Sequence, residues 1–255
     1  MPGCPLSTPA SNIAALVDGI PQVERALVVV AHPDDIDFSC AGTVARLTES
    51  GVEVTYLLAT RGDQGGFDAD QDRAAVGPQR EAEQRAAAAE VGVTDVRFLD
   101  ERDGHVVASL DLRHAVSRVI RQVRPQLVLT HNPEWNWSAM PANHPDHMAV
   151  GEATVRAVYP DARNPFAFPT LVSDEGLPAW TVHELWILGL EPCDHVVDIT
   201  EQMPRKVAAL RAHASQTADA DIAGLLEGWN GGIARRAALG TGRYGEEFRR
   251  VLIPM

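Results

Sequence analysis

An α/β fold, with a mostly parallel sheet and helices on both faces, is what the sequence predicts. Strand-like and helix-like segments alternate four times between residues 26 and 130, which is the pattern of successive strand–helix–strand units. The strand-like segments are apolar almost throughout, as is typical of strands buried on both faces of a sheet. Of the 255 residues, 45% are hydrophobic and 22% charged, so a sizeable core is available. We expect one domain over 1–255.

The elements of the first half follow from local signals. Residues 26–32, ALVVVAH, form a β-branched run that ends at a predicted turn. Residues 62–77 are polar and rich in glycine, which predicts a loop. The helix that follows has Pro78 in its first turn and ends before Gly92. The other elements expected here are strands over 52–60, 96–99 and 126–130 and helices over 41–50, 78–91 and 110–123.

The second half begins with a long loop after Thr130 and is less regular. Thr200 is a suitable N-cap for a helix, and the glycines of 228–232 predict a break in a later one. We expect the C-terminal part, about 200–255, to be helical. The elements expected in this half are helices over 147–159, 200–214 and 219–240, strands over 183–189 and 195–199, and a proline-rich excursion over 161–178.

Charge and cysteine content limit the classes of partner. The chain has 22 Lys and Arg against 35 Asp and Glu, a net charge of −13. We expect it to bind neither nucleic acid nor an anionic membrane, because both select for basic surface. No run of about 18 apolar residues occurs, so no membrane insertion is expected. The three cysteines are widely spaced without a CxxC pair, which favours a reducing, cytoplasmic setting. The expected partner is a small molecule, and a homo-oligomer stays open.

Two similar tetrapeptides follow predicted strands. His32-Pro33-Asp34-Asp35 ends the first strand, and His144-Pro145-Asp146-His147 lies in the loop after the strand at 126–130. In open α/β sheets, ligands bind beyond the carboxyl ends of the strands, where the strand order reverses. If these two strands are neighbours, the tetrapeptides face each other across one crevice.

Imidazoles with a carboxylate, and no thiolate, form a donor set that suits a hydrolytic zinc ion with one open position. His32, Asp35 and one later histidine would supply the ligands. Asp34 would then be free to act as general base toward a metal-activated water. Taken singly the signals are weak: Asp34 also suits a turn after proline, and an HxxH pair in a loop has many uses.

The segment AHPDDIDFSCAGTVARL, residues 31–47, closely resembles the signature of the PIG-L/LmbE-like zinc deacetylases. TRGDQGG at 60–66, QRE at 79–81 and NHPDHMAVGEA at 143–153 resemble further segments of that family, and KVAALRAHASQ at 206–216 does so less specifically. The resemblance covers about residues 25–216. It implies a Rossmann-like fold with the metal site at the carboxyl ends of the strands.

The resemblance also implies a role for each matching residue. Zinc would be held by His32, Asp35 and His147, although other divalent transition metals suit such a set. Asp34 would be the general base and His144 the group that stabilises the oxyanion, with Asp146 orienting His144. Less securely, the substrate hydroxyls would contact Arg80 and Asp103.

The sequence departs from the family pattern at two positions. Many members have Glu directly after HPDD, where this chain has Ile36 followed by Asp37, a shorter acid whose reach is in question. Asn143 stands where Gly often precedes HPDH. Among other residues, Trp135 and Trp137 either stack on a sugar or only pack their loop. We expect a structural hydrogen bond for His131, and a surface or packing position for His213.

The resemblance, together with the candidate site, implies a zinc-dependent hydrolase that removes the N-acetyl group from an N-acetylglucosamine-like sugar and releases acetate and the amine. The family's substrates include glycosyl-phosphatidylinositol precursors, thiol precursors, chitobiose and glycosylated natural products. An amidase that cleaves sugar–thiol S-conjugates at the same site is the first alternative. A catalytically silent metal-binding relative is the second, and the presence of Asp34, His144 and Asp146 argues against it.

Overall fold

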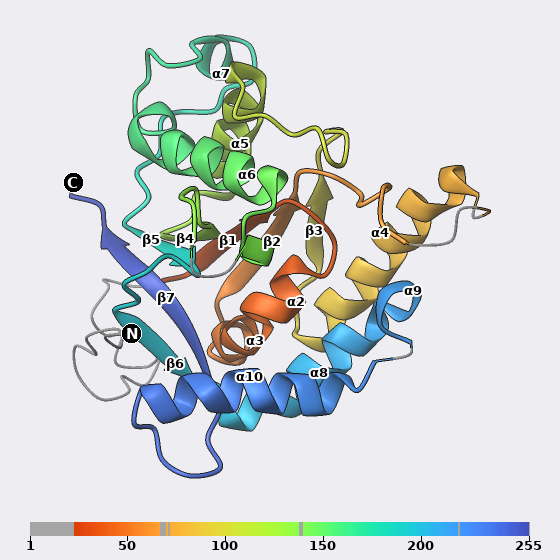
Figure 1. Cartoon of the computed structure of the whole chain (residues 1–255). Helices are drawn as coiled ribbons and strands as arrows, with labels where there is room; N and C mark the ends of the chain where they lie inside the picture. Colours follow the sequence, from red (N-terminus) through yellow and green to blue (C-terminus); the bar gives the residue numbers. More distant parts are fainter. Residues whose placement is uncertain (1–22, 67–69, 71, 138–139, 219, 255) are drawn as a thin grey trace.

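A computed structural model describes residues 23–66, 70, 72–137, 140–218 and 220–254. Its centre is a seven-stranded sheet in the order β3-β2-β1-β4-β5-β7-β6 (Figure 1). The first five strands of this order run parallel, and β7 is antiparallel to both of its neighbours. The strands are β1 (Arg25–Val30), β2 (Glu53–Leu58), β3 (Asp95–Phe98), β4 (Leu127–His131), β5 (Glu184–Leu188), β6 (His195–Asp198) and β7 (Gly245–Leu252).

Strand β1 lies in the middle of the parallel part, between β2 and β4. Its side chains alternate between the two faces: Val28 and Val30 belong to one apolar core, and Leu27 and Val29 to the other. The uniformly apolar run in the sequence is therefore explained by burial on both sides, as predicted. Because the chain builds outward from β1 to β3 and then returns to β4 on the other side, the strand order reverses between β1 and β4.

Helices cover both faces of the sheet, as predicted (Figure 1). One face carries α3 (Ala41–Glu49), α4 (Arg73–Glu90), α8 (Met203–Ala212) and α10 (Ile222–Arg236). The other carries α5 (Leu110–Val123) and α6 (Pro145–Arg156). Within the described ranges no helix has both the length and the apolar character to cross a membrane. The short elements are α2 (Asp35–Ser39), α7 (Thr170–Ser173), α9 (Ala214–Thr217), the 3-10 turns Met140–Ala142 and Thr200–Gln202, and a π-helical turn Ala157–Asp161.

Four expectations about helices are wrong in detail. Thr200, the expected N-cap, is the first residue of a 3-10 turn, and α8 begins only at Met203. Helix α4 begins at Arg73, within the predicted loop, because the Asp72 side chain caps it by accepting a hydrogen bond from the Ala74 N–H. Helix α6 begins at Pro145 rather than 147, with the ring of His144 as its cap. Helix α10 continues through the glycines of 228–232 without a break.

The C-terminal part is not wholly helical, because its last element is the strand β7. This strand inserts between β5 and β6 and places the buried Glu246 against the N-terminus of α3. The carboxylate of Glu246 accepts hydrogen bonds from the N–H groups of Gly42 and Thr43, at 3.0 and 2.7 Å. The end of the chain thus stabilises the helix that follows the HPDD segment.

Candidate metal centre and active site

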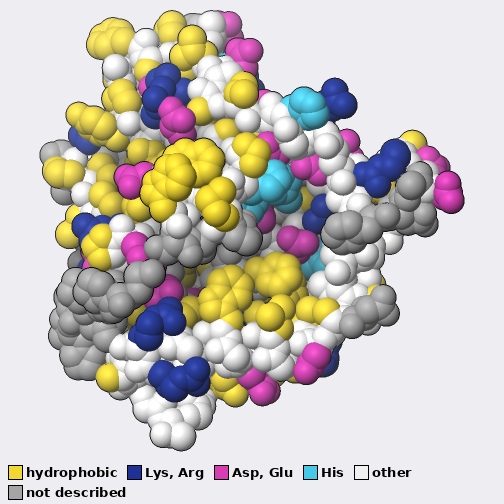
Figure 2. Space-filling model, in the orientation of Figure 1, with side chains coloured by type: hydrophobic (Ala, Val, Ile, Leu, Met, Phe, Trp, Pro, Cys, Tyr) yellow, Lys and Arg dark blue, Asp and Glu magenta, His cyan; other side chains and the backbone are white. Residues whose placement is uncertain are grey.

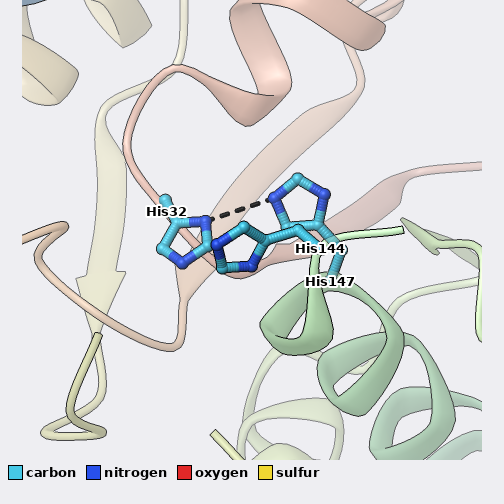
Figure 3. Close-up of side chains that lie close together, drawn as sticks. All are labelled: His32, His144 and His147. Carbon is cyan, nitrogen blue, oxygen red and sulfur yellow. Dashed lines mark hydrogen bonds between the residues drawn. The ribbon is translucent and has the colours of Figure 1, made fainter. Parts of the chain in front are cut away.

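The two tetrapeptides meet at the carboxyl ends of β1 and β4, which are hydrogen-bonded neighbours. His32 follows β1 directly, whereas His144 and His147 come from the start of α6, after the long loop that leaves β4. Figure 3 shows the three imidazoles facing one another. In Figure 2 the same face of the molecule is hollowed around histidine and acidic side chains. This is the crevice at the reversal of strand order that the sequence predicted.

His32, Asp35 and His147 form a triangle of donor atoms. Nε2 of His147 lies 3.2 Å from Nδ1 of His32 and 3.1 Å from Oδ1 of Asp35. Nδ1 of His32 lies 3.5 Å from Oδ2 of Asp35. Ligand atoms at zinc distances of about 2.0–2.2 Å from a tetrahedral ion lie about 3.3–3.6 Å apart. The described clusters that could hold a metal ion here include His32 with His144 and His147, and Asp35 with His131 and His147, so the set His32, Asp35 and His147 stays a prediction.

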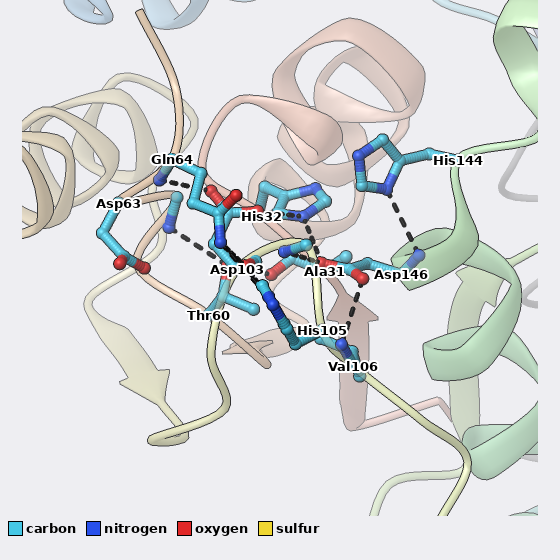
Figure 4. Close-up of polar contacts among 12 residues, drawn as sticks. Ala31, His32, Thr60, Asp63, Gln64, Asp103, His105, Val106, His144 and Asp146 are labelled. Carbon is cyan, nitrogen blue, oxygen red and sulfur yellow. Dashed lines mark hydrogen bonds and ion pairs between the residues drawn. The ribbon is translucent and has the colours of Figure 1, made fainter.

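Two buried carboxylates orient the ring of His32. Its Nε2 lies 3.1 Å from both Oδ1 of Asp103 and Oδ2 of Asp146 (Figure 4). An Nε2–H that donates to these carboxylates leaves the lone pair on Nδ1, the atom that faces the triangle. Burial alone would lower the pKa of His32, but hydrogen bonds with Asp103, Asp146 and Asp35 outweigh it and raise the pKa to about 11. Without a metal the ring is therefore protonated on both nitrogens, and a metal ion bound at Nδ1 would displace the proton from that atom.

Asp146 contacts a different histidine from the expected one. Its carboxylate reaches His32 and accepts hydrogen bonds from the backbone N–H groups of Gly104 and Val106, at 2.7 and 3.1 Å. Only its backbone N–H reaches His144, donating to Nδ1 at 3.2 Å. Burial raises the pKa of Asp146, but the bonds from His32 and the two amides outweigh it, and the pKa is lowered. The side chain therefore orients a predicted metal ligand rather than His144.

Asp34 borders the ligand triangle in an unusual backbone conformation. Its φ is +79°, in the left-handed region that costs a non-glycine residue roughly 1–3 kcal/mol. Two side chains of α4 hold it there: Oε1 of Gln84 accepts from the Asp34 N–H at 2.9 Å, and Nη2 of Arg80 lies 3.1 Å from Oδ2. Burial, followed by the charge of Asp35, raises the pKa of Asp34 to about 6. A carboxylate with this pKa exchanges a proton readily near neutral pH.

Arg80 is committed to the protein. It is 6% exposed and donates to the backbone oxygens of Gly62 and Pro33 as well as to Asp34. A Cβ at Gly62, where φ is +66°, would collide with its guanidinium, so the glycine of the TRGD segment makes room for Arg80. Its contacts with Asp34 make it a positioning group, while a substrate contact by Arg80 or Asp103 stays a prediction.

A buried polar chain continues from Gln84 into the C-terminal half. Nε2 of Gln84 donates to Oδ2 of Asp37 at 2.9 Å, and Nε2 of His213 lies 2.8 Å from the same oxygen. All three side chains are fully buried. Although Asp37 is one methylene shorter than Glu, its carboxylate therefore reaches both Gln84 and His213. His213 is buried rather than at the surface. Through it, the segment 206–216 is linked by hydrogen bonds to Asp37, and by way of Gln84 to the HPDD turn.

His131, at the end of β4, supports Asp35. Its Nε2 accepts from the Ala31 N–H at 3.1 Å or, in the other tautomer, donates to Oδ2 of Asp35 at 3.1 Å, and its ring stacks on that of His147 at 4.1 Å. The expected structural hydrogen bond is thus confirmed. Burial and the neighbouring His147 lower the pKa of His131 to about 4, so the ring is neutral. Its place directly after a strand was the signal in the sequence.

His144 is held in one tautomer. Its Nδ1 accepts the Asp146 N–H, so a neutral ring carries its proton on Nε2. Burial and the nearby His32 and His147 lower the pKa of His144, which favours this neutral form. Its ring lies edge-on to that of His32, at 4.8 Å. A neutral imidazole with a free N–H is a suitable donor to a developing oxyanion.

A cavity of about 440 Å³, here named the polar chamber, is lined by six of the residues described above: His32, Asp34, Asp35, Asp103, His144 and His147. Its other walls come from Gln64, Gly65, Arg80 and Gly104, so every described lining residue is charged, polar or glycine. Trp135 and Trp137 do not line it. They stack on each other at 5.3 Å and are 52% and 77% exposed. A sugar contact by either one stays a prediction.

Hydrolysis with a metal ion is the chemistry that this arrangement suits, because a three-ligand site leaves a position for water beside a titratable carboxylate. The family described as PIG-L, GlcNAc-PI de-N-acetylase, matches residues 27–158. The chain belongs to this family and is a hydrolase of carbon–nitrogen amide bonds. Its His/Asp cluster could bind a metal ion.

The similar proteins include deacetylases of two kinds. The diacetylchitobiose deacetylase of Thermococcus kodakarensis is 30% identical over 230 residues, 90% of this chain and 84% of that protein. The 1D-myo-inositol 2-acetamido-2-deoxy-alpha-D-glucopyranoside deacetylase 1 of Saccharopolyspora erythraea is 32% identical over 267 residues, covering 86% and 84%. Among solved structures, the N,N'-diacetylchitobiose deacetylase of Pyrococcus horikoshii is 27% identical, with a TM-score of 0.81 over 91% of this chain and 85% of that one.

Proposed function

We propose that this protein is a zinc-dependent N-deacetylase that cleaves the acetamide of an N-acetylglucosamine-like sugar and releases acetate and the free amine. The observation that carries the proposal is the ligand triangle of His32, Asp35 and His147 beside Asp34, whose pKa is raised to about 6. Zinc suits three nitrogen and oxygen ligands with an open fourth position. The relatives named for N-acetylated sugar substrates support the substrate class.

Each group at the site has a separate role in the proposed hydrolysis. Zinc, when bound, would polarise the acetamide carbonyl and make a bound water acidic. Asp34 accepts the proton of the attacking water and later returns it to the nitrogen of the departing amine. His144 donates its Nε2–H to the oxygen that becomes negative during attack. Asp103 and Asp146 keep the ring of His32 in the tautomer that leaves Nδ1 free.

The polar chamber supports a sugar as the group that carries the acetamide. Its lining carries carboxylate, amide and imidazole groups throughout, which suits the hydroxyl groups of one pyranose ring. Its volume of about 440 Å³ lies within the range of roughly 300–1,000 Å³ typical of ligand sites.

Acetate release from a panel of substrates tests the proposal. The panel contains N-acetylglucosamine, N,N'-diacetylchitobiose, N-acetylglucosamine linked to inositol or to malate, and one sugar–thiol conjugate. We expect the purified protein to release acetate, to lose this activity after treatment with a chelator, and to regain it with zinc. Activity that persists in the metal-free protein would contradict a zinc mechanism. Cleavage of the thiol conjugate alone would replace the deacetylase with an amidase.

A further inference from the structure

A buried ion pair joins the C-terminal half of the chain to the two short helices that follow the HPDD turn. Nζ of Lys206, on α8, lies 2.6 Å from Oε1 of Glu246, on β7. Both side chains are fully buried. No step of the proposed hydrolysis uses either group, so the role of the pair lies elsewhere.

The pair occupies the place of a missing helical hydrogen bond. In a continuous α-helix, the N–H of residue 42 would donate to the carbonyl of residue 38. Here the Phe38 carbonyl accepts from Nζ of Lys206 at 2.7 Å, and the Gly42 N–H donates to Oε1 of Glu246 at 3.0 Å. The other carboxylate oxygen accepts from the Thr43 N–H at 2.7 Å. Each partner thus takes one half of the bond that would join α2 to α3.

Residues from distant segments maintain the break between α2 and α3. It lies at Cys40, whose φ of −144° and ψ of 13° are not helical and whose side chain gives α3 no cap. Glu246 supplies the acceptors that an N-cap residue would normally provide. A Cβ at Gly42 would lie 2.7 Å from Cδ1 of Ile199, so the glycine lets α3 begin in close contact there. In Figure 1, α2 and α3 are accordingly separate coils.

Stability alone does not account for this ion pair. Removing two charges from water is costly, and well-packed apolar side chains of similar volume often stabilise a fold equally well or better. The Phe38 carbonyl and the Gly42 N–H would also satisfy each other if α2 and α3 were one helix. The pair is therefore needed because the two helices are separate, and this separation sets the direction of α2.

The direction of α2 matters because this helix begins at Asp35. Asp35 and Phe38 are three residues apart, about 4.5 Å along the helix axis, so a shift at the end of α2 reaches its start. Oδ1 of Asp35 lies 3.1 Å from Nε2 of His147. A misplacement of about 1 Å at a catalytic centre is enough to lower its activity strongly.

The segment 206–216 holds α2 at two points. Lys206 and His213, the C-cap of α8, are seven positions apart, which is two helical turns and places both near one side of α8. Lys206 binds the Phe38 carbonyl, and Nε2 of His213 lies 2.8 Å from Oδ2 of Asp37. Two consecutive residues of α2 are therefore fixed from the same helix.

We propose that the Lys206–Glu246 pair is a positioning device for the metal centre, which keeps α2 and α3 apart and so directs the Asp35 carboxylate toward His147. Both residues act through the backbone of residues 38–43. The proposal rests on the proposed function, in which Asp35 is a metal ligand.

A double substitution separates positioning from stability. In Lys206→Met/Glu246→Leu, apolar side chains of similar volume replace the pair, and no buried charge is left without a partner. We expect the free energy of unfolding of the metal-free protein, measured in urea, to stay near the wild-type value. Affinity for Co²⁺, a probe whose visible absorption reports the geometry of its ligands, should fall at least about tenfold, with a changed spectrum. Competition with a calibrated chelator measures the affinity.

The matched control is Arg113→Met/Asp161→Leu. It removes an ion pair with a 2.9 Å contact between α5 and the π-helical turn, on the other face of the sheet. Its Co²⁺ affinity and spectrum should equal those of the wild type. The proposal is overturned if Lys206→Met/Glu246→Leu binds Co²⁺ like the wild type, or if the control loses as much affinity.

Glu246→Gln decides the question if the double variant does not fold. The size of the side chain is kept, but its NH₂ group faces at least one of the donors of Gly42, Thr43 and Lys206, so the break loses a hydrogen bond. Co²⁺ affinity about tenfold lower supports the positioning role, and wild-type affinity overturns it.

Failure of the proposed function gives a different result. If the wild type binds metal but releases no acetate from any sugar, the comparison of Co²⁺ affinities is unaffected. If the wild type binds no metal, crystal structures of the wild type and of the folded variant decide. A continuous helix over 35–49, or a displaced Asp35, upholds the positioning role, whereas an unchanged break overturns it.

Discussion

Asp34 and Asp146 occupy the same third position in two nearly identical tetrapeptides, yet the structure gives them opposite surroundings. Asp34 stands in a left-handed turn at the wall of the polar chamber, and burial with the charge of Asp35 raises its pKa to about 6. Asp146 lies in the first turn of α6 with 0% exposure, and hydrogen bonds from His32 and two backbone amides lower its pKa against the effect of burial.

The difference shows how one motif can serve two purposes. A carboxylate that is short of donors and close to another negative charge can gain and lose a proton near neutral pH. A carboxylate that accepts three hydrogen bonds stays ionised and acts as a fixed acceptor. Asp34 is therefore suited to proton transfer and Asp146 to fixing the orientation of His32. The first prediction tests the former role and the second tests the latter.

The largest effect is expected for Asp34→Asn. The amide has nearly the same shape and its oxygen can still accept from Arg80, but it accepts no proton from the attacking water. We expect kcat to fall by a factor of about 10² to 10⁴, the usual contribution of a positioned general base. Zinc content, measured by elemental analysis, should stay at the wild-type level, because none of the three proposed ligands changes.

Wild-type kcat in Asp34→Asn would contradict the base assignment. Loss of zinc together with kcat would show that Asp34 acts on the metal rather than on the proton.

A smaller effect of a different kind is expected for Asp146→Asn. Its oxygen can still accept from the Gly104 and Val106 amides, but its NH₂ group then faces the Nε2–H of His32, donor against donor. The ring of His32 loses the partner that fixes its tautomer, and we expect zinc affinity to fall about 10- to 100-fold. Competition with a calibrated chelator measures this change.

Excess zinc should restore much of the activity of Asp146→Asn but none of that of Asp34→Asn. If zinc restores both variants or neither, the distinction between the two aspartates does not hold.

Much of this site could be predicted because its information is local. Strand-like runs next to HPDD and HPDH, and the rule that ligand sites lie where strand order reverses, placed His32, Asp35 and the two histidines of HPDH at one crevice. The apolar run at 26–30 likewise predicted a strand buried on both faces, which the structure confirms. The resemblance then supplied roles that spacing alone left open.

The remainder depends on contacts between distant parts of the chain. Nothing near Asp146 in the sequence shows that its partner is His32, 114 positions earlier. The strand β7 is rich in Glu and Arg, and its pairing with β5 and β6 outweighs a composition that reads as helical. Trp229 looked like part of a helix break because glycines surround it, yet packing keeps α10 continuous. Gln84 lies one helical turn after Arg80, so both side chains point from the same face of α4. This spacing could have predicted that Gln84, like Arg80, contacts the HPDD turn.

The smallest effect concerns the buried chain His213–Asp37–Gln84, which holds the backbone turn at Asp34. Burial lowers the pKa of His213, but its hydrogen bond to Asp37 and the charge of that carboxylate outweigh burial, and the pKa is raised. A raised folded-state pKa adds to the free energy of unfolding. This contribution is fully present below the unfolded pKa of about 6.5 and is lost as pH rises through the folded pKa.

In His213→Gln, which keeps an N–H donor for Asp37, this loss of stability with rising pH should disappear. Urea unfolding of the metal-free proteins across this pH window measures it, with His213→Ala as the variant that lacks the donor and loses about 1–3 kcal/mol more. If His213→Gln keeps the wild-type pH dependence, His213 is neutral in the folded protein, and the Asp37–Gln84 chain holds Asp34 without its charge.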